Sequence, residues 1–168
     1  MYFPTIIQIQ KMLDQVLVWL DKAEEYAESR KFDTKVLLAS RLYPDMHPFG
    51  RQIQIITDNA KGIAGRLGGK PAPTLEDNET TFEELRARIQ KVKSFLAGFS
   101  EQDFAQADEA KCVLGFMPGK YLKGHEYYHQ FALPNLYFHL TTAYAILRHN
   151  GVPLGKGDYI GQLPLHDL

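Results

Sequence analysis

Apolar residues recur at intervals of three and four over four segments of the chain, which is the spacing of an amphipathic helix. The first segment begins at Pro4, a residue that suits the first turn of a helix, and predicts a helix over residues 4–29. The second begins at Phe49 and ends at the glycine pair after Leu67, where a chain readily leaves a helix. Between them, residues 31–48 mix prolines and aspartates with a short apolar run, so we expect an ordered connection.

The third and fourth helical segments follow a loop with two prolines. Thr80-Thr-Phe-Glu83 has the form of a capping box, in which threonine and glutamate satisfy free backbone donors, and it predicts a helix that ends near Gly98. The fourth segment runs from about Glu126 to Arg148 and is followed by a glycine and a proline, as expected at a helix exit.

Residues 100–124 break the helical pattern between the third and fourth helices. A proline and a glycine lie between the apolar runs around Cys112 and Tyr121, which favours a small β-hairpin. Further on, Pro134 either starts the main part of the last helix or kinks it. Four helices can bury their apolar faces only against one another. We therefore predict one all-α domain over residues 1–168, a four-helix bundle with a small β-hairpin before the last helix and with its topology open.

Composition and charge narrow the classes of function. The 168 residues include 19 basic and 20 acidic side chains, a formal charge of −1, so a nucleic-acid partner is not expected. No uncharged apolar run approaches the ~20 residues of a membrane helix, and we expect no membrane partner. Cys112 is the sole cysteine, which excludes an internal disulfide and favours a reducing, cytoplasmic location. We expect Cys112 to be a packing residue rather than a catalytic thiol.

One short string formally matches a zinc-peptidase motif. His125-Glu-Tyr-Tyr-His129 has the H-E-x-x-H form, in which two imidazoles bind zinc and Glu126 activates water. A catalytic zinc needs a third protein ligand, and no glutamate follows His129, although Asp158 could in principle serve as an aspartate ligand. We therefore expect His125 and His129 to lie on the exposed rim of the last helix instead of binding metal.

The last helix carries polar groups on one face. Asn135, His139 and Thr142 recur at intervals of four and three in a largely apolar helix. Polar groups that are buried must be hydrogen-bonded or must bind something. A histidine in this setting is more often a satisfied core residue than a ligand.

A family resemblance begins in this same helix. The run from Leu133 through His139 and Arg148 to Gly151-Val resembles the end of the last helix in the DinB/YfiT-like four-helix superfamily of metalloenzymes, in an uncharacterised bacterial branch described as a domain of unknown function. The strings Leu42-Tyr-Pro-Asp-Met, Glu79-Thr-Thr-Phe and Gly155-Lys-Gly-Asp-Tyr resemble the same branch. The resemblance spans most of the chain and implies a four-helix bundle.

The resemblance also implies where a divalent metal such as zinc or nickel would bind. Members of the superfamily place one histidine in the second helix and two histidines one turn apart in the last helix. In this chain His139 occupies the position of the second histidine of the last helix, and Asn135 replaces the first. Gln54 falls near the position of the histidine in the second helix, and His47 is the runner-up ligand there. Amide oxygens bind such metals more weakly than imidazoles do, so this set predicts a degenerate or absent metal site.

The same residues could line a pocket for a small organic ligand instead. For that pocket we name Gln54, Asn135, His139 and Asp58. Three other polar residues lie beside apolar helical positions and could line the same cavity or be solvated: Arg41, Gln52 and Asp45. Of these, we expect Asp45 to cap a helix.

Four functions follow from these alternatives. The first is a small cytoplasmic binding protein with a degenerate or absent metal site, and the second is a metal-dependent thiol transferase that uses His139. The third is a zinc peptidase through His125, Glu126 and His129. The fourth is a structural or regulatory homodimer, a state that bundles of this superfamily often adopt. The pattern of residues favours the first.

Overall fold

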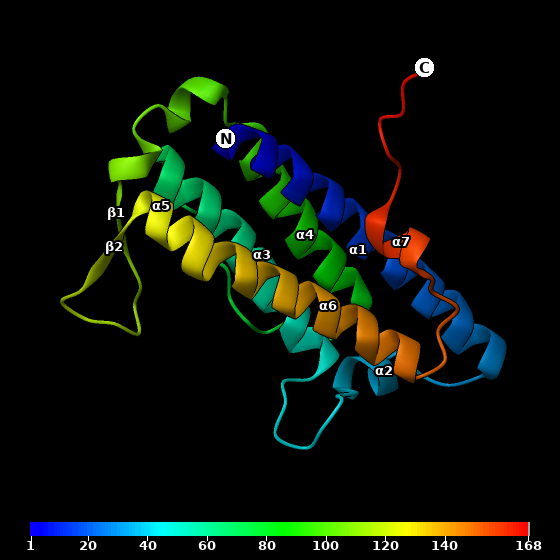
Figure 1. The fold of residues 1–168 in the computed structure, drawn as a ribbon. Coiled ribbons are helices and arrows are strands. Elements are labelled where there is room, and N and C mark those ends of the chain that lie inside the picture. Colours follow the sequence, from blue (N-terminus) through cyan, green and yellow to red (C-terminus); the bar gives the residue numbers. More distant parts are fainter. Residues whose placement is uncertain (168) are drawn as a thin grey trace.

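Four long helices lie side by side, with a hairpin at one end of the bundle and a short helix on its flank (Figure 1). The computed structural model describes residues 1–167. The long helices are α1 (Tyr2–Arg30), α3 (Phe49–Gly68), α4 (Phe82–Ala97) and α6 (Leu133–His149). The predicted all-α four-helix bundle with a small hairpin before the last helix is confirmed.

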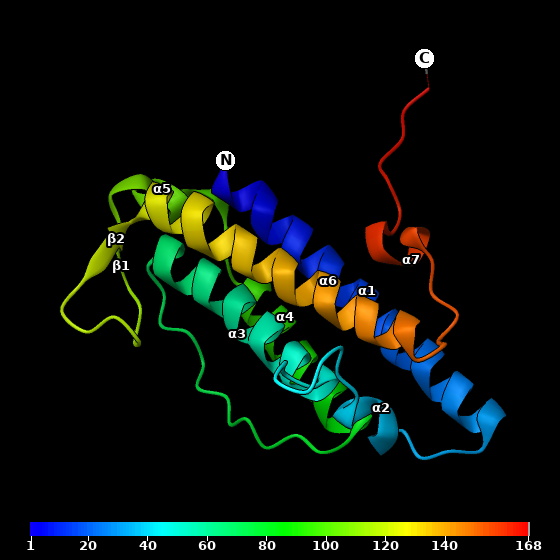
Figure 2. The ribbon, with the colours of Figure 1, turned by 60° about the horizontal axis from the view of Figure 1, so that its bottom comes forward.

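The four helices run in two opposed pairs, and this settles the topology. Helices α1 and α6 run in one direction and α3 and α4 in the other (Figures 1 and 2). Because α3 and α4 are parallel, residues 70–81 must return along the whole bundle, and we call this segment the strap (Figure 2). The strap begins after Gly69, which has a φ of 69°, a left-handed conformation that glycine adopts at little cost.

The connection between α1 and α3 contains a short helix that the sequence pattern did not reveal. This helix, α2 (Lys35–Ala39), starts where the Asp33 carboxylate accepts a hydrogen bond from the Lys35 amide, and it buries Leu37. The prediction that Asp45 caps the next helix is wrong. Pro48 is the N-terminal cap of α3, without a side-chain cap, and Asp45 is exposed in the preceding turn.

The capping box of α4 lies one residue beyond its predicted place. The Thr81 hydroxyl accepts a hydrogen bond from the Glu84 amide, and the Glu84 carboxylate accepts one from the Thr81 amide, each at 3.1 Å. The sequence Thr-Thr-Phe-Glu-Glu fits the pattern in two registers. The second register prevails because it leaves Phe82 buried as the first residue of the helix.

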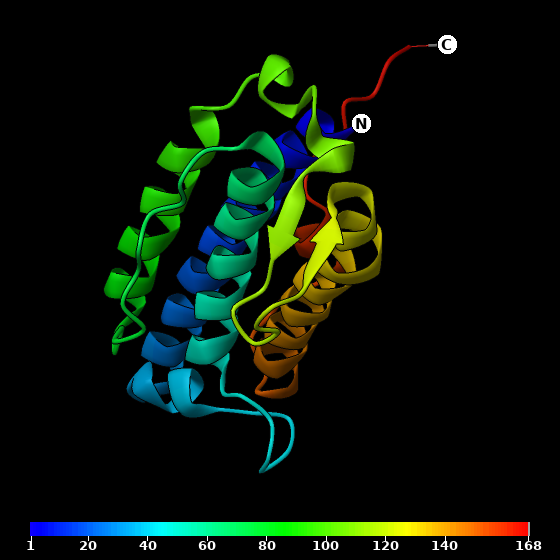
Figure 3. The same ribbon diagram turned by 90° about the vertical axis from the view of Figure 1, so that its left-hand side faces the viewer.

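The segment after α4 makes two turns of 3-10 helix and then the predicted hairpin. Strands β1 (Lys111–Val113) and β2 (Tyr121–Lys123) are antiparallel, with Cys112 opposite Leu122. The hairpin projects from the end of the bundle where α3 ends and the last helix begins (Figures 1 and 3). Within residues 1–167, no helix combines the length and apolarity that crossing a membrane requires.

The last long helical region of the chain, residues 124–149, has three parts. A short α5 (Gly124–Glu126) leads into a π-helix at Tyr127–Ala132, and α6 continues from Leu133 with Pro134 as its second residue. Proline lacks a backbone N–H and its ring clashes with the carbonyl four residues back, so a regular α-turn cannot pass through it. The wider π-turn before Pro134 accommodates this, and the proline marks the start of α6.

A short C-terminal helix, α7 (Lys156–Ile160), packs on α1 and was not predicted. The indole nitrogen of the fully buried Trp19 donates a hydrogen bond to the Asp158 carbonyl at 2.9 Å, and the indole stacks on Tyr159 with 5.7 Å between ring centroids. The core between the long helices is built mainly of aliphatic side chains from all four, among them Leu13, Leu20, Ile53, Ile56, Leu85, Ile89, Leu140 and Ile146.

Candidate functional site

Three polar pairs join helix α3 to α6 and to the π-helix that precedes it, and we call this line of contacts the α3–α6 seam. The α3 members are spaced by seven residues, about two helical turns, so they share one face of the helix. The pairs and their distances are Gln52 with His139 at 2.6 Å, Asn59 with Asn135 at 2.9 Å, and Arg66 with Tyr127 at 3.3 Å. Because the two helices are antiparallel, the seam runs along the bundle from the start of α3 toward the start of α6.

The Gln52 amide fixes the tautomer of His139. Its Nε2 donates a hydrogen bond to the His47 carbonyl at 3.0 Å, so its Oε1 is the atom that faces His139. A carbonyl oxygen can only accept, and the Nδ1 of His139, 2.6 Å away, must therefore carry the proton. The Nε2 of the neutral ring is left with a lone pair, which can accept a hydrogen bond.

The surroundings of His139 hold the ring neutral. Burial, reinforced by the positive charges of His47 and Arg51, lowers the pKa of His139 from 6.5 to about 4. The residue is 9% exposed, so a small part of it reaches solvent. At neutral pH the imidazole is therefore an uncharged acceptor with slight access to solvent.

The second pair of the seam contains an unsatisfied donor. Asn135 donates from Nδ2 to the Oδ1 of Asn59 at 2.9 Å. The Nδ2 of Asn59 is buried, and no hydrogen-bond partner for it lies within residues 1–167. A buried N–H without a partner is costly, and such a group is usually met by ordered water or by a ligand atom.

Gln54, which we expected to join His139 and Asn135, lies elsewhere. Two residues along a helix correspond to a rotation of about 200°, so Gln54 faces away from the partner that Gln52 meets. Its amide accepts from Arg51 at 3.0 Å and donates to Glu79 at 2.9 Å. It lines a cavity of about 340 Å³ beside α2 and the end of the strap.

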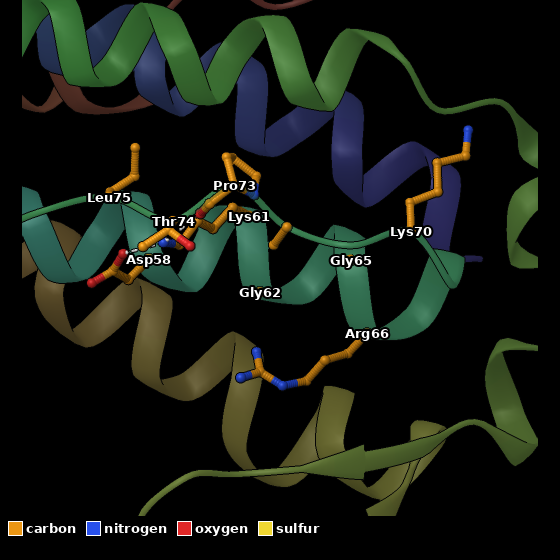
Figure 4. A pocket seen from close by; sticks show the side chains of 10 residues that line it. Asp58, Lys61, Gly62, Gly65, Arg66, Lys70, Pro73, Thr74 and Leu75 are labelled. Atoms are coloured by element: carbon orange, nitrogen blue, oxygen red, sulfur yellow. Dashed lines mark hydrogen bonds and ion pairs between the residues drawn. The ribbon is translucent and has the colours of Figure 1, made fainter.

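Asp58, the fourth residue expected in the pocket, lines a groove of about 570 Å³ between α3 and the strap (Figure 4). Its carboxylate pairs with Lys61 at 2.9 Å and with Arg88 at 3.0 Å. In Figure 4, Asp58 and Lys61 lie together beneath Pro73 and Thr74, whereas Arg66 and Lys70 point away in opposite directions. The groove therefore does not present a cluster of free cations.

Within residues 1–167, Arg88 is at the centre of the largest group of polar contacts, and the sequence pattern did not identify it as a site residue. Its side chain is 1% exposed, and its guanidinium meets three carboxylates, two of them on the strap, as well as one hydroxyl and two backbone carbonyls. The carboxylates belong to Asp58, Asp77 and Glu79, each at 2.9–3.0 Å. The detectable signal was a charged residue within the apolar register of α4, between Leu85 and Ile89.

The seam does not fit a zinc or nickel ion of the kind that the family resemblance implies. Within the part of the chain that the structure describes, no group of three or more His, Cys, Asp or Glu side chains could hold a metal ion. Both ends of the Gln52 amide already bond to the protein, and His47 is exposed. What remains is one imidazole and an asparagine amide, a weak donor set for these ions.

The residues of the peptidase-like string have other roles. His125 and His129 are exposed, and the Glu126 carboxylate accepts a hydrogen bond from the Lys123 amide at 2.9 Å, which caps α5. The π-turn begins between the two histidines, so their regular one-turn alignment is lost. The candidate third ligand, Asp158, is held by Lys22 at 2.6 Å.

Cys112 lies in the hairpin with its side chain against the core, 0% exposed. Burial raises the pKa of its thiol, although Arg66 acts in the opposite direction. A protonated, inaccessible thiol is a poor nucleophile. Its environment matches the packing role that we expected.

Comparison with known proteins agrees with this architecture. The chain is similar to the crystal structure of a DinB family member protein from Shewanella denitrificans, with 48% sequence identity, a TM-score of 0.95, and coverage of 99% of this chain and 95% of that one. The fold is therefore that of a DinB-like helical bundle. A family model described as "Domain of unknown function (DUF1993)" matches residues 1–160, and the chain belongs to this family. No curated protein matches the chain.

Proposed function

We propose that this protein is a metal-independent member of the DinB family that binds a small organic molecule at the α3–α6 seam. His139 would be the anchor and would accept a hydrogen bond through Nε2. The observation that carries the proposal is the contact of 2.6 Å between His139 and Gln52, because it leaves a neutral imidazole with its lone pair directed away from the protein partner.

The neighbours of His139 indicate the class of ligand. An acceptor selects a molecule with a hydroxyl or N–H donor, and the unsatisfied Nδ2 of Asn59 would in turn select an acceptor. The ring of Phe138, 56% exposed and perpendicular to the imidazole with centroids 5.2 Å apart, offers an apolar surface at the rim. These features favour a small aromatic or cyclic molecule with a hydroxyl group.

The metal-dependent alternatives receive less support. A thiol transferase would require a metal with several strong protein ligands and open positions, and the donor set around His139 does not supply them. A zinc peptidase would need His125, Glu126 and His129 to converge, whereas Glu126 is occupied as a helix cap.

Matched probe pairs test the proposal. In anisole a methyl group replaces the hydroxyl hydrogen of phenol, which removes the hydrogen-bond donor and keeps the aromatic ring. Binding through His139 therefore predicts that phenol shifts the histidine ring signals in a heteronuclear NMR titration and that anisole has a much smaller effect. His139→Phe should abolish the response. His149→Phe, a change at an exposed histidine of the same helix, should leave it intact. Equal responses to the two probes, or a response that survives His139→Phe, would contradict the proposed role of His139.

A further inference from the structure

The β1–β2 hairpin presents apolar side chains to solvent at its tip. Antiparallel pairing places Val113 opposite Tyr121, and these two are 56% and 54% exposed. Two further residues of the connecting turn, Phe116 and Met117, are 65% and 46% exposed. Four large apolar side chains exposed within nine consecutive residues form a patch of the kind that marks an interaction site.

Lysines border this patch at the base of the hairpin. Side chains alternate along a strand, so Lys111 and Lys123 lie on the same face as Val113 and Tyr121, while Cys112 and Leu122 face the core. With Lys120 at the turn, residues 111–123 carry three positive charges and no negative one. Within residues 1–167, the one ion pair of these lysines joins Lys123 to Glu109 at 3.0 Å.

The placement of two lysines directly opposite each other points to an external anion. Lys111 pairs with Lys123 across the strands, and like charges in that position destabilise a sheet. The Lys111 ammonium lies over the Tyr121 ring, 5.3 Å from its centroid, and so stays near the apolar pair. Within residues 1–167, Glu109 pairs with Lys123 alone, so an external anionic group at this level would be bound by Lys111 and Lys120.

We propose that the hairpin docks this protein onto an anionic lipid surface. Two residues along a strand span about 7 Å, which separates the lysine pair from the apolar pair. Apolar groups of interfacial segments enter a bilayer by about 5–10 Å, so the tip would lie among the acyl chains while the lysines meet the lipid phosphates. Such docking requires no spanning helix, and the absence of a long apolar run in the sequence does not bear on it.

Vesicle flotation with the full chain tests this proposal. The protein should float with phosphatidylcholine vesicles that contain phosphatidylserine and should remain in solution with pure phosphatidylcholine. Lys111→Gln and Lys120→Gln should each weaken binding by about fivefold, and Phe116→Ser by about tenfold or more. Lys91→Gln and Ile7→Ser, which change an exposed lysine and an exposed isoleucine elsewhere, should have no effect.

Tryptophan fluorescence adds a second readout. The native Trp19 is fully buried, so a blue shift in Phe116→Trp on adding anionic vesicles would report insertion of the tip. Equal flotation with neutral and anionic vesicles, or no flotation at all, would overturn the proposal. So would a dimer in light scattering that Phe116→Ser disrupts, because a second copy of the chain would then cover the patch.

Discussion

The Nδ1 of His139 on α6 lies 2.6 Å from the Oε1 of Gln52 on α3. This contact crosses the interface between the two helices at a point where both residues are buried. Since Gln52 is itself anchored to the His47 carbonyl, the imidazole is oriented by a chain of two hydrogen bonds that starts from the backbone. The orientation of His139 is therefore a property of the fold and does not depend on a bound ion.

Replacement of Gln52 by leucine should destabilise the protein. The change leaves the buried Nδ1–H of His139 without its acceptor, and an orphaned buried donor costs about 1–3 kcal/mol. Urea denaturation measures the difference in the free energy of unfolding. Gln90→Leu, at an exposed position of α4, is the matched control and should change stability by less than about 0.5 kcal/mol. Equal effects of the two changes would show that the contact contributes nothing.

The pH dependence of stability follows from the lowered pKa of His139. The folded pKa is about 4 and the unfolded value about 6.5, so the unfolded chain takes up the proton first as the pH falls. The contribution is fully present above about pH 6.5 and is lost by about pH 4, a difference of about 3 kcal/mol.

His139→Gln isolates this contribution, because a glutamine amide can still donate to Gln52 but does not titrate in this range. Denaturation curves at a series of pH values should show wild type losing stability relative to the variant as the pH falls through this window. A stability difference that is independent of pH would mean that His139 titrates alike in both states.

The attachment of the strap to the bundle, and with it the stability of the fold, should depend on Arg88. Arg88→Met removes the cation that three carboxylates share and leaves them close together and partly buried, which should cost about 3–5 kcal/mol. Arg86→Met, two residues away, removes ion pairs with Asp21 and Glu24 near the surface and should cost at most about 1 kcal/mol. Thermal and urea unfolding measure the loss of stability in the two variants. A smaller loss at Arg88 than at Arg86 would contradict the role given to the buried cluster.

The junction before the π-helix should tolerate no side chain at Gly124. A methyl group there would overlap the Ala107 carbonyl, which belongs to the backbone and cannot move aside easily. Gly124→Ala should therefore destabilise the protein by about 1–3 kcal/mol or more. Gly115→Ala, in the hairpin turn with open space around it, is the control and should be close to neutral. Both can be measured by thermal unfolding.

The helices were predictable because each has a continuous apolar face and a clear end, as with Phe49 through Leu67 in α3. The apolar pattern of α3 could not predict which of its two glutamines, Gln52 or Gln54, contacts His139. Both are buried, so the apolar pattern does not separate them, and the position of α6 brings Gln52 to His139. The spacing of Gln52, Asn59 and Arg66 by seven residues was a visible signal of one polar face, and it would have favoured Gln52.

Other features depend on tertiary contacts that no local pattern encodes. α7 is only five residues long, and it is fixed by contacts of Asp158 with Trp19 and Lys22 on α1. The role of Arg88 depends on the strap, whose carboxylates reach it only because α3 and α4 run parallel. The sequence indicated that Arg88 was unusual for its register but not which residues surround it.

The protonation state of the His139 ring can be read from a long-range proton–nitrogen NMR spectrum of the histidine-labelled protein. We expect a neutral ring near pH 6 with the proton on Nδ1 and an unprotonated Nε2, unchanged when zinc or nickel is added. A proton on Nε2, a pKa close to 6.5, or a stoichiometric shift of the His139 signals on adding either metal would contradict this expectation.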